Sequence, residues 1–329
     1  MWDRVLGHEG PKKFLKKYLQ AQDRPHGLLF LGSRGLGKGL LAREFIKSLL
    51  CQHGLGNDNC TSCRLLNFDT GNIAHKDFLQ VAIKEGSKTI KVEQIRDLIS
   101  NGSYGPAMGK YKVCLIEDAD KMLPVAANAI LKLLEEPPEG WIFILLAESE
   151  ERLLPTVLSR LVIIRFQPVA EEQVKSFLVG RGLEKDKAAV LARLCEGSPG
   201  RALTLEEEQL WQWRQQAQGL LEALPMERPL YYITSRSWLE KAERKQLVLL
   251  LELLQLLVRD MLLLKAGQKD VYNSDLVPWL EDKARGWRQK ALKQVIELLQ
   301  EAYLALEASA GMKLVLEALV LKIDRIYKE

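Results

Sequence analysis

The sequence predicts an α/β domain built on a parallel sheet, followed by a small helical unit and a larger all-α domain. Three observations support this order. Short apolar runs alternate with helical patterns through the first half of the chain, which is typical of strands joined by crossover helices. Strand signals stop after Pro168, and leucines at helical spacing with few glycines dominate residues 206–329. The 329 residues, 47% of them hydrophobic, have room for two or three domains.

The expected elements follow from short buried-strand runs and longer amphipathic patterns. Strands are expected at 27–31, 78–81, 113–116, 142–147 and 162–166, and helices at 10–21, 38–50, 92–99 and 125–135. Residues 51–77, rich in Gly, Asn, Asp and Cys, are expected to form an irregular insertion. The predicted domains are therefore 1–166, containing this insertion, the small helical unit 167–205, and the helical domain 206–329.

Charge and hydropathy exclude some classes of function. The net charge of +4 is too small to indicate a nucleic-acid partner by itself. The most apolar stretch, 247–264, includes Glu252, Arg259 and Asp260, so it is expected to be a buried bundle helix and not a membrane span. The N-terminus has no apolar core typical of a signal peptide. Five cysteines without a secretion signal predict a cytoplasmic protein.

A glycine-rich loop joins the first expected strand to the next helix. Its sequence is GSRGLGKG, with Gly32, Gly35, Gly37, Lys38 and Gly39 at the positions of a phosphate-binding loop. In such a loop backbone N–H groups cradle phosphates and the lysine reaches the terminal ones. The motif has Ser or Thr after the lysine, and the hydroxyl of that residue holds Mg²⁺. In this chain the position is occupied by Gly39. The alternative is a glycine-rich turn that binds no ligand.

A second acidic site follows the strand expected at 113–116. P-loop ATPases place an Asp here for Mg²⁺ and then a Glu that orients the attacking water. This chain has Glu117 first and Asp118 second, so each carboxylate is displaced by about one methylene from the position that catalysis requires. The alternative is a pair of solvated acids at a strand end.

These motifs, taken in order, resemble those of the bacterial clamp-loader AAA+ subunits, of the delta-prime and gamma/tau types. The resemblance covers roughly the first 205 residues and rests on VLGHE, HGLLFLGSRGLGKG, KVCLIEDADKML, ANAILKLLEEPP, LLPTVLSRL and GSPGRAL. It implies an AAA+ P-loop domain, a helical lid at 167–205 and a C-terminal helical collar that forms a ring.

Departures from the pattern favour the delta-prime type, which does not hydrolyse ATP, over the ATP-hydrolysing gamma/tau type. They are Gly39 after the lysine, the inverted Glu117-Asp118 pair, the sequence Ala-Glu-Ser at 147–149 in place of a threonine sensor, and a lid arginine, Arg201, one residue later than usual. ATP and Mg²⁺ are therefore expected to bind weakly or not at all. The gamma/tau type remains the alternative.

The resemblance also implies partners and one catalytic residue. Such subunits form a pentameric ring with gamma/tau and delta subunits, which loads the sliding clamp onto primed DNA; the DNA is contacted through the assembled complex, and no membrane is involved. Arg160, in Ser159-Arg160-Leu161, matches an arginine that acts in trans on a neighbour's nucleotide. The alternative is a surface arginine paired with a nearby acid.

Three cysteines in the insertion, Cys51, Cys60 and Cys63, match ligands of a four-cysteine zinc module in the family, whose last position is Leu66 here. Structural zinc takes four Cys or His ligands, so the set is incomplete. His53 and His75 are the candidates for a fourth ligand. The alternative is an insertion in which packing has replaced the metal.

Overall fold

A computed structural model describes residues 2–54, 56, 60–101, 105–207, 210–235 and 242–329. The chain forms two compact units, residues 1–181 with 195–201, and residues 182–194 with 202–329. The helical unit predicted at 167–205 is divided between these two units. The predicted domain boundaries remain predictions.

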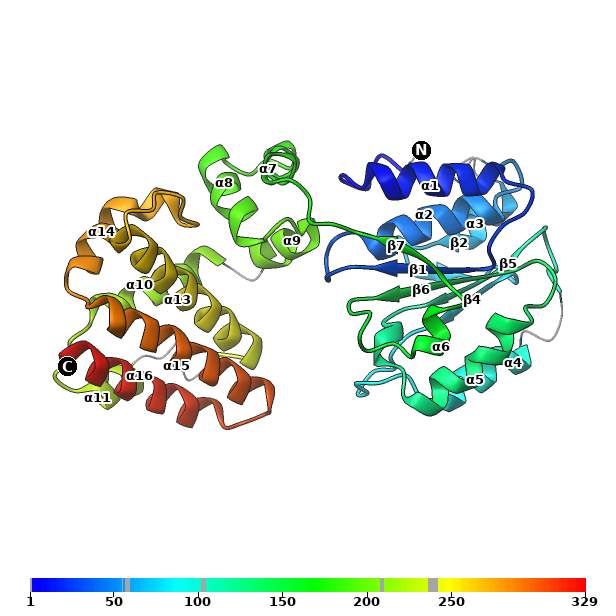
Figure 1. The fold of residues 1–329 in the computed structure, drawn as a ribbon. Coiled ribbons are helices and arrows are strands. Elements are labelled where there is room, and N and C mark those ends of the chain that lie inside the picture. The colour runs from blue at the N-terminus through cyan, green and yellow to red at the C-terminus, as the bar shows by residue number, and fades with distance from the viewer. Residues whose placement is uncertain (1, 55, 57–59, 102–104, 208–209, 236–241) are drawn as a thin grey trace. The chain divides into compact units, whose positions relative to one another are not determined.

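The first unit is built on a five-stranded parallel sheet, with the strands in the order β4-β5-β6-β1-β7 (Figure 1). The strands are β1 Gly27–Leu31, β4 Phe78–Val81, β5 Lys112–Ile116, β6 Trp141–Ala147 and β7 Val162–Arg165. Each begins and ends within one residue of the predicted run. The parallel sheet expected from the alternating pattern is thus confirmed.

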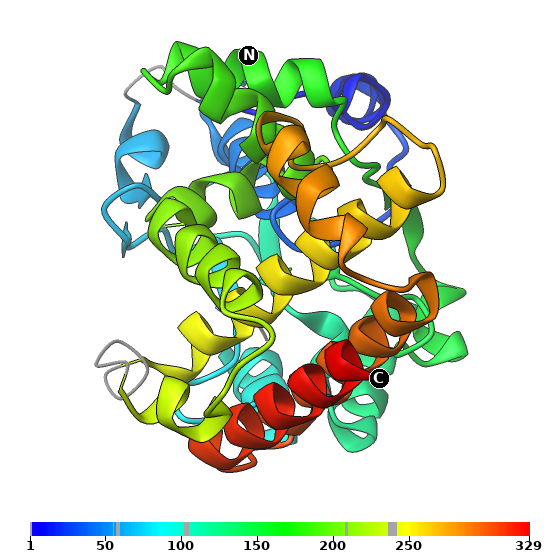
Figure 2. The same ribbon diagram turned by 90° about the vertical axis from the view of Figure 1, so that its left-hand side faces the viewer.

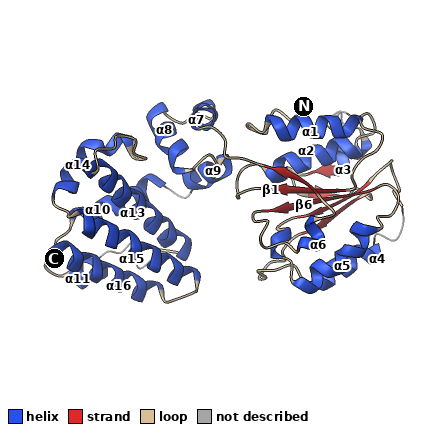
Figure 3. Cartoon of the chain, in the orientation of Figure 1, coloured by secondary structure: helices blue, strands red, loops and turns tan. Residues whose placement is uncertain are grey.

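Two layers of helices cover the sheet, so its apolar runs are buried on both faces (Figure 3). One layer contains α1 Glu9–Gln20 and α2 Lys38–Leu50; the other contains α4 Val92–Asn101, α5 Pro124–Glu135 and the short α6 Pro155–Leu158. Alternate residues of β1 enter different cores: Leu28 and Phe30 pack with Phe45 on the first face, and Leu29 packs with Ile130 on the second. This double burial explains why the strands are continuous apolar runs. The helix α7, Glu171–Gly180, completes this unit.

The cysteine-containing insertion is more regular than its composition indicates. It contains α3 Thr61–Leu65 and a small antiparallel hairpin, β2 Leu66–Asn67 with β3 Asn72–Ile73. The sequence reading missed these elements because each is only two to five residues long. Leu66 is fully buried in the core and Phe68 packs beside it, so apolar contacts hold the hairpin to the domain.

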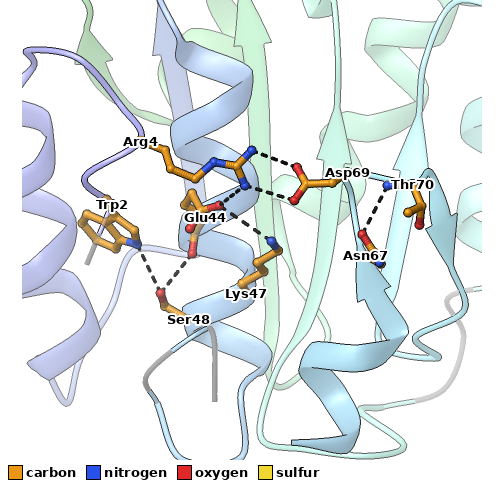
Figure 4. A network of polar contacts seen from close by, with 8 residues as sticks. All are labelled: Trp2, Arg4, Glu44, Lys47, Ser48, Asn67, Asp69 and Thr70. Atoms are coloured by element: carbon orange, nitrogen blue, oxygen red, sulfur yellow. Dashed lines mark hydrogen bonds and ion pairs between the residues drawn. The ribbon is translucent and has the colours of Figure 1, made fainter. Parts of the chain in front are cut away.

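Polar contacts also connect the insertion to the N-terminal segment and α2 (Figure 4). Arg4 donates two hydrogen bonds to Asp69, at 3.0 and 3.1 Å, and lies 4.0 Å from Glu44 of α2. The Trp2 indole donates to the Ser48 hydroxyl at 3.3 Å. The hairpin is therefore held at its tip by ion pairs as well as at its base by Leu66.

The second unit consists of helices only. They are α8 Lys185–Leu194, the continuation of α9 Pro199–Glu207, α10 Leu210–Glu222, α11 Pro229–Thr234, α13 Arg244–Lys265, η2 Ser274–Leu276, α14 Val277–Arg285, α15 Gln289–Glu307 and α16 Met312–Lys328. The long helix α13 packs against both α10 and α15, and α16 lies along α15 (Figure 2). Most leucines of α13 are buried, as predicted for the apolar stretch 247–264. In the described part of the chain, no helix has the length and apolar character needed to cross a membrane.

Candidate functional site

The glycine-rich loop lies between β1 and α2, at the carboxyl edge of the sheet. This edge is where ligands of open α/β sheets bind. Gly32, Gly35 and Gly37 all have positive φ angles, 152°, 79° and 93°, so the loop has the backbone that the motif predicts. Lys38 is the first residue of α2.

The side chain of Lys38 turns back onto its own loop. Its ammonium donates hydrogen bonds to the carbonyl oxygens of Gly32, at 2.5 Å, and Ser33, at 2.8 Å, and the residue is only 8% exposed. Burial is the largest influence on the pKa of Lys38 and lowers it, while nearby carboxylates, Glu148 first, act in the opposite direction. The group expected to reach terminal phosphates therefore binds loop carbonyls instead.

Residues 198–201, which follow α8 in the sequence, also contact the glycine-rich loop. The Ser198 hydroxyl donates to the Arg34 carbonyl at 3.0 Å, and the Gly200 N–H donates to the Gly35 carbonyl at 2.9 Å. A Cβ on Gly35 would lie 2.9 Å from the backbone nitrogen of Arg201, so only glycine fits here. The structure thus brings Arg201 to the loop through its backbone, while its side chain lies 3.9 Å from Glu196.

The two acids after β5 both have partners within the chain. Glu117 accepts hydrogen bonds from Arg43 of α2 at 3.1 Å and from Gln80 of β4 at 3.2 Å. Asp118 has a left-handed backbone, with φ 51°, and pairs with Lys121 at 2.9 Å. Sequence reasoning placed both acids at the correct edge but did not find Arg43 or Gln80, which lie in other elements and belong to no motif.

Asp120, two residues further on, is the most buried acid of this edge. Its side chain is fully buried, and its Oδ1 accepts the N–H of Glu148 at 3.3 Å. Its Oδ2 has no hydrogen-bond donor in the described structure, and the nearest cation, on Arg152, is 4.0 Å away. This carboxylate therefore links β5 to the loop after β6, and no sequence motif had singled it out.

A cavity of 720 Å³ opens beside the loop, between Gly32-Ser33 and residues 148–168. Its lining includes Glu148, Glu150 and Glu151, and its one basic residue, Arg165, pairs with Glu150 at 2.6 Å. Carboxylates repel phosphate oxygens, so this cavity is poorly suited to a nucleotide.

Arg160 lies just after α6 and is about one-third exposed. Its guanidinium pairs with Glu135 of α5 at 2.7 Å and donates to the Thr156 carbonyl at 2.8 Å. In the single chain Arg160 is thus a surface arginine with an acidic partner, and the structure does not place it near the chain's own loop.

The cysteines of the insertion come together. The sulfur atoms of Cys51, Cys60 and Cys63 all lie within 4.8 Å of one another, and those of Cys51 and Cys60 are 4.0 Å apart. Tetrahedral zinc with Zn–S bonds of about 2.3 Å places sulfurs about 3.8 Å apart, so the three fit three corners of such a site.

The fourth ligand position of the family's zinc module has no metal-binding side chain here. Leu66, at the position of its fourth cysteine, is fully buried among apolar residues. Neither His53 nor His75 joins the cluster of potential metal ligands among the residues that the structure describes. The residues placed here therefore do not complete a closed zinc site, which takes four ligands.

His75 is instead expected to make the stability of the fold depend on pH. Its ring is buried, and Nδ1 accepts the N–H of Asp77 at 3.1 Å. Burial, the largest cause, lowers the pKa of His75, while the charge of Asp77 acts in the opposite direction. As the pH falls, His75 therefore takes up a proton more readily in the unfolded chain, where its pKa is near 6.5, than in the folded protein. The contribution of neutral His75 to the stability of the fold is thus complete above about pH 6.5 and is lost as the pH falls below it.

We therefore expect His75→Asn to reduce the loss of stability between about pH 7.5 and 5.5, because an amide oxygen can accept the same N–H without titrating. The measurement is urea denaturation of both proteins at the two pH values. His53→Asn, at an exposed position, is the control. Equal pH dependence in wild type and His75→Asn would contradict the assignment.

The chain is similar in sequence to known proteins over most of its length. The family described as "DNA polymerase III, delta subunit" matches residues 7–170. DNA polymerase III subunit delta' of Escherichia coli is 32% identical over 273 residues, which is 80% of this chain and 78% of that protein. DNA polymerase III subunit delta' of Bacillus subtilis is 27% identical over 316 residues, 95% of this chain and 94% of that protein.

A gamma-type relative matches over a shorter length. DNA polymerase III subunit gamma of Buchnera aphidicola is 32% identical over 188 residues, 55% of this chain. The chain spans about half the length of that relative, 51%, whereas it spans most of the two delta' proteins.

The strand order, the loop after β1 and the acids after β5 define a P-loop α/β protein of the AAA+ class. Within this class the longer matches are to delta' subunits: those of Escherichia coli and Bacillus subtilis cover 80% and 95% of this chain, whereas the Buchnera gamma subunit covers 55%. The chain belongs to the family of DNA polymerase III delta-prime subunits.

Proposed function

We propose that this chain is a non-hydrolysing subunit of a bacterial clamp loader. It occupies one position in a pentameric ring with gamma/tau and delta subunits and helps to place the sliding clamp on primed DNA in the cytoplasm. It meets the DNA through the assembled complex. The proposal rests on membership of the delta-prime family and on the state of the P-loop site.

One observation supports the proposal that the chain does not hydrolyse ATP. The polar side chains that would bind Mg·ATP form hydrogen bonds and ion pairs within the chain. Lys38 is hydrogen-bonded to loop carbonyls, Glu117 to Arg43, and Asp118 to Lys121. A nucleotide and its metal ion would have to compete with these contacts. No hydroxyl at residue 39 is then present to hold the metal ion.

We expect the purified chain to show no ATP turnover above background. Gly39→Thr, which supplies the missing hydroxyl, is expected to remain inactive although it fits: a Cβ on Gly39 would make only an ordinary contact, 3.7 Å from Leu146. The remaining defects lie in the acids and in Lys38. The measurement is steady-state phosphate release together with labelled-ATP binding.

The same assay tests the alternative, an ATP-hydrolysing gamma/tau-type subunit, which the similarity to the Buchnera gamma subunit favours. A steady-state rate that disappears in Lys38→Ala would establish that alternative. Reconstitution with gamma/tau and delta subunits tests the ring itself: failure to enter a stable complex with them would contradict the clamp-loader assignment.

The proposed contribution to catalysis is made in trans. Arg160 is about one-third exposed just after α6, and a guanidinium binds phosphate oxygens through two N–H groups. In a ring it would leave Glu135 and reach the nucleotide of an adjacent subunit.

A further inference from the structure

The cysteine cluster has a chemistry that does not require a fourth ligand. Cys51 is the residue after α2 and Cys60 precedes α3, and their sulfurs are 4.0 Å apart. A disulfide has an S–S distance of about 2.05 Å, so closure needs the sulfurs to approach by about 2 Å. Cys60 also accepts the N–H of Cys63 at 3.5 Å, which fixes the position of its sulfur beside Cys51.

A small oxidant has a route to Cys51. Cys51 lines a half-open cavity of 470 Å³ between the ends of α1 and α2 and residues 108–111. Arg24 and Lys110 line the same cavity, and none of its described lining residues is acidic. A small polar oxidant can therefore approach Cys51 through this cavity.

The insertion is also held without a metal. Leu66 and Phe68 fix the hairpin to the core, and Arg4 binds Asp69. Zinc is therefore not needed to keep the three cysteines near one another.

We propose that Cys51 and Cys60 form a peroxide-sensitive dithiol, which converts reversibly to an intramolecular disulfide. The Cys51 thiolate attacks hydrogen peroxide and cleaves its O–O bond, giving a sulfenic acid and hydroxide. The Cys60 sulfur attacks the sulfenic sulfur, forming the S–S bond and releasing the oxygen as water. Two thiols lose two electrons and two protons, and one peroxide becomes two waters. This inference does not depend on the proposed function.

The other cysteines differ in their surroundings. Cys114 is fully buried in β5, and burial raises the pKa of its thiol. Burial likewise raises the pKa of the Cys195 thiol. Both are expected to react slowly, and Cys195→Ser is a matched control for substitutions in the cluster.

The test is oxidation of the full chain, stripped of metal by chelation, with a small excess of hydrogen peroxide. We expect loss of about two of the five thiols, a mass decrease of about 2 Da and a Cys51–Cys60 linked peptide, all reversed by dithiothreitol. Cys51→Ser and Cys60→Ser should abolish the linkage, whereas Cys195→Ser and Cys63→Ser should retain it. Circular dichroism checks that each variant is folded.

Three results would overturn the proposal. The first is a wild-type product containing only sulfinic or sulfonic acids, or no oxidised cysteine. The second is a disulfide that joins Cys63 to either neighbour in place of the Cys51–Cys60 bond. The third is about one zinc per chain in protein purified without chelator, with the cysteines unreactive at the same peroxide dose.

Discussion

In a reconstituted clamp-loader ring, Arg160→Ala is expected to lower ATP turnover at the neighbouring site about a thousandfold while leaving the ring assembled. An arginine supplied in trans stabilises charge on the transferring phosphoryl group, and effects of this size are typical of such fingers. Alanine removes the guanidinium. It leaves the backbone that ends α6 unchanged, so the subunit should fold and assemble.

The ion pair to Glu135 is the contact that this role must break. The pair is partly exposed, with the two side chains 33% and 48% accessible, and such pairs contribute only about 0–1 kcal/mol. Breaking this ion pair so that Arg160 can bind a phosphate therefore costs little free energy. Glu135→Gln, which weakens the pair without moving the arginine, should leave turnover at least as high as in the wild type.

The measurement is DNA- and clamp-stimulated ATPase of rings whose composition has been checked by gel filtration. Arg165→Ala is the matched control, because Arg165 forms a comparable exposed ion pair, with Glu150 at 2.6 Å. Unchanged turnover and clamp loading in an assembled Arg160→Ala ring would rule out the finger and leave Arg160 as a surface ion pair.

The sheet could be predicted from the sequence because its three central strands, β5, β6 and β1, are buried on both faces. Runs such as Gly27–Leu31 and Trp141–Ala147 are entirely buried, so every position along them is apolar and the run itself marks the strand. The hairpin at Leu66–Asn67 and Asn72–Ile73 gave no such signal, since only one or two of its residues face the core.

The site was predictable in its motif residues and not in their partners. Gly35 and Lys38 follow from a local pattern in which spacing fixes the backbone. Other partners of the site come from distant positions: Ser198 is 164 residues from Arg34, and Arg43 is 74 residues from Glu117. Hydrogen bonds between elements depend on how helices pack on the sheet, which local periodicity does not determine.

A buried polar network in the second unit leads to the other large expected effect. Asp260 of α13 is fully buried and accepts three hydrogen bonds, from the Tyr272 N–H at 3.0 Å, the Asn273 N–H at 2.8 Å and the Asn273 amide at 2.7 Å. Asn273 in turn accepts a hydrogen bond from Arg214 of α10 at 2.9 Å. The segment before α14 is thus tied to α13 through the Asp260 carboxylate and to α10 through the Asn273 side chain.

Asp260→Ala is expected to reduce the free energy of unfolding by about 3 kcal/mol or more, because it leaves several buried donors without an acceptor. Urea denaturation followed by circular dichroism measures the loss. The control is Asp270→Ala, ten residues further along: that side chain is 94% exposed and lies 3.6 Å from Arg193, so its removal should change stability by less than about 0.5 kcal/mol. If Asp260→Ala destabilises the protein by less than about 1 kcal/mol, the carboxylate does not hold this segment, and apolar packing of α13 against α10 and α15 must maintain the unit instead.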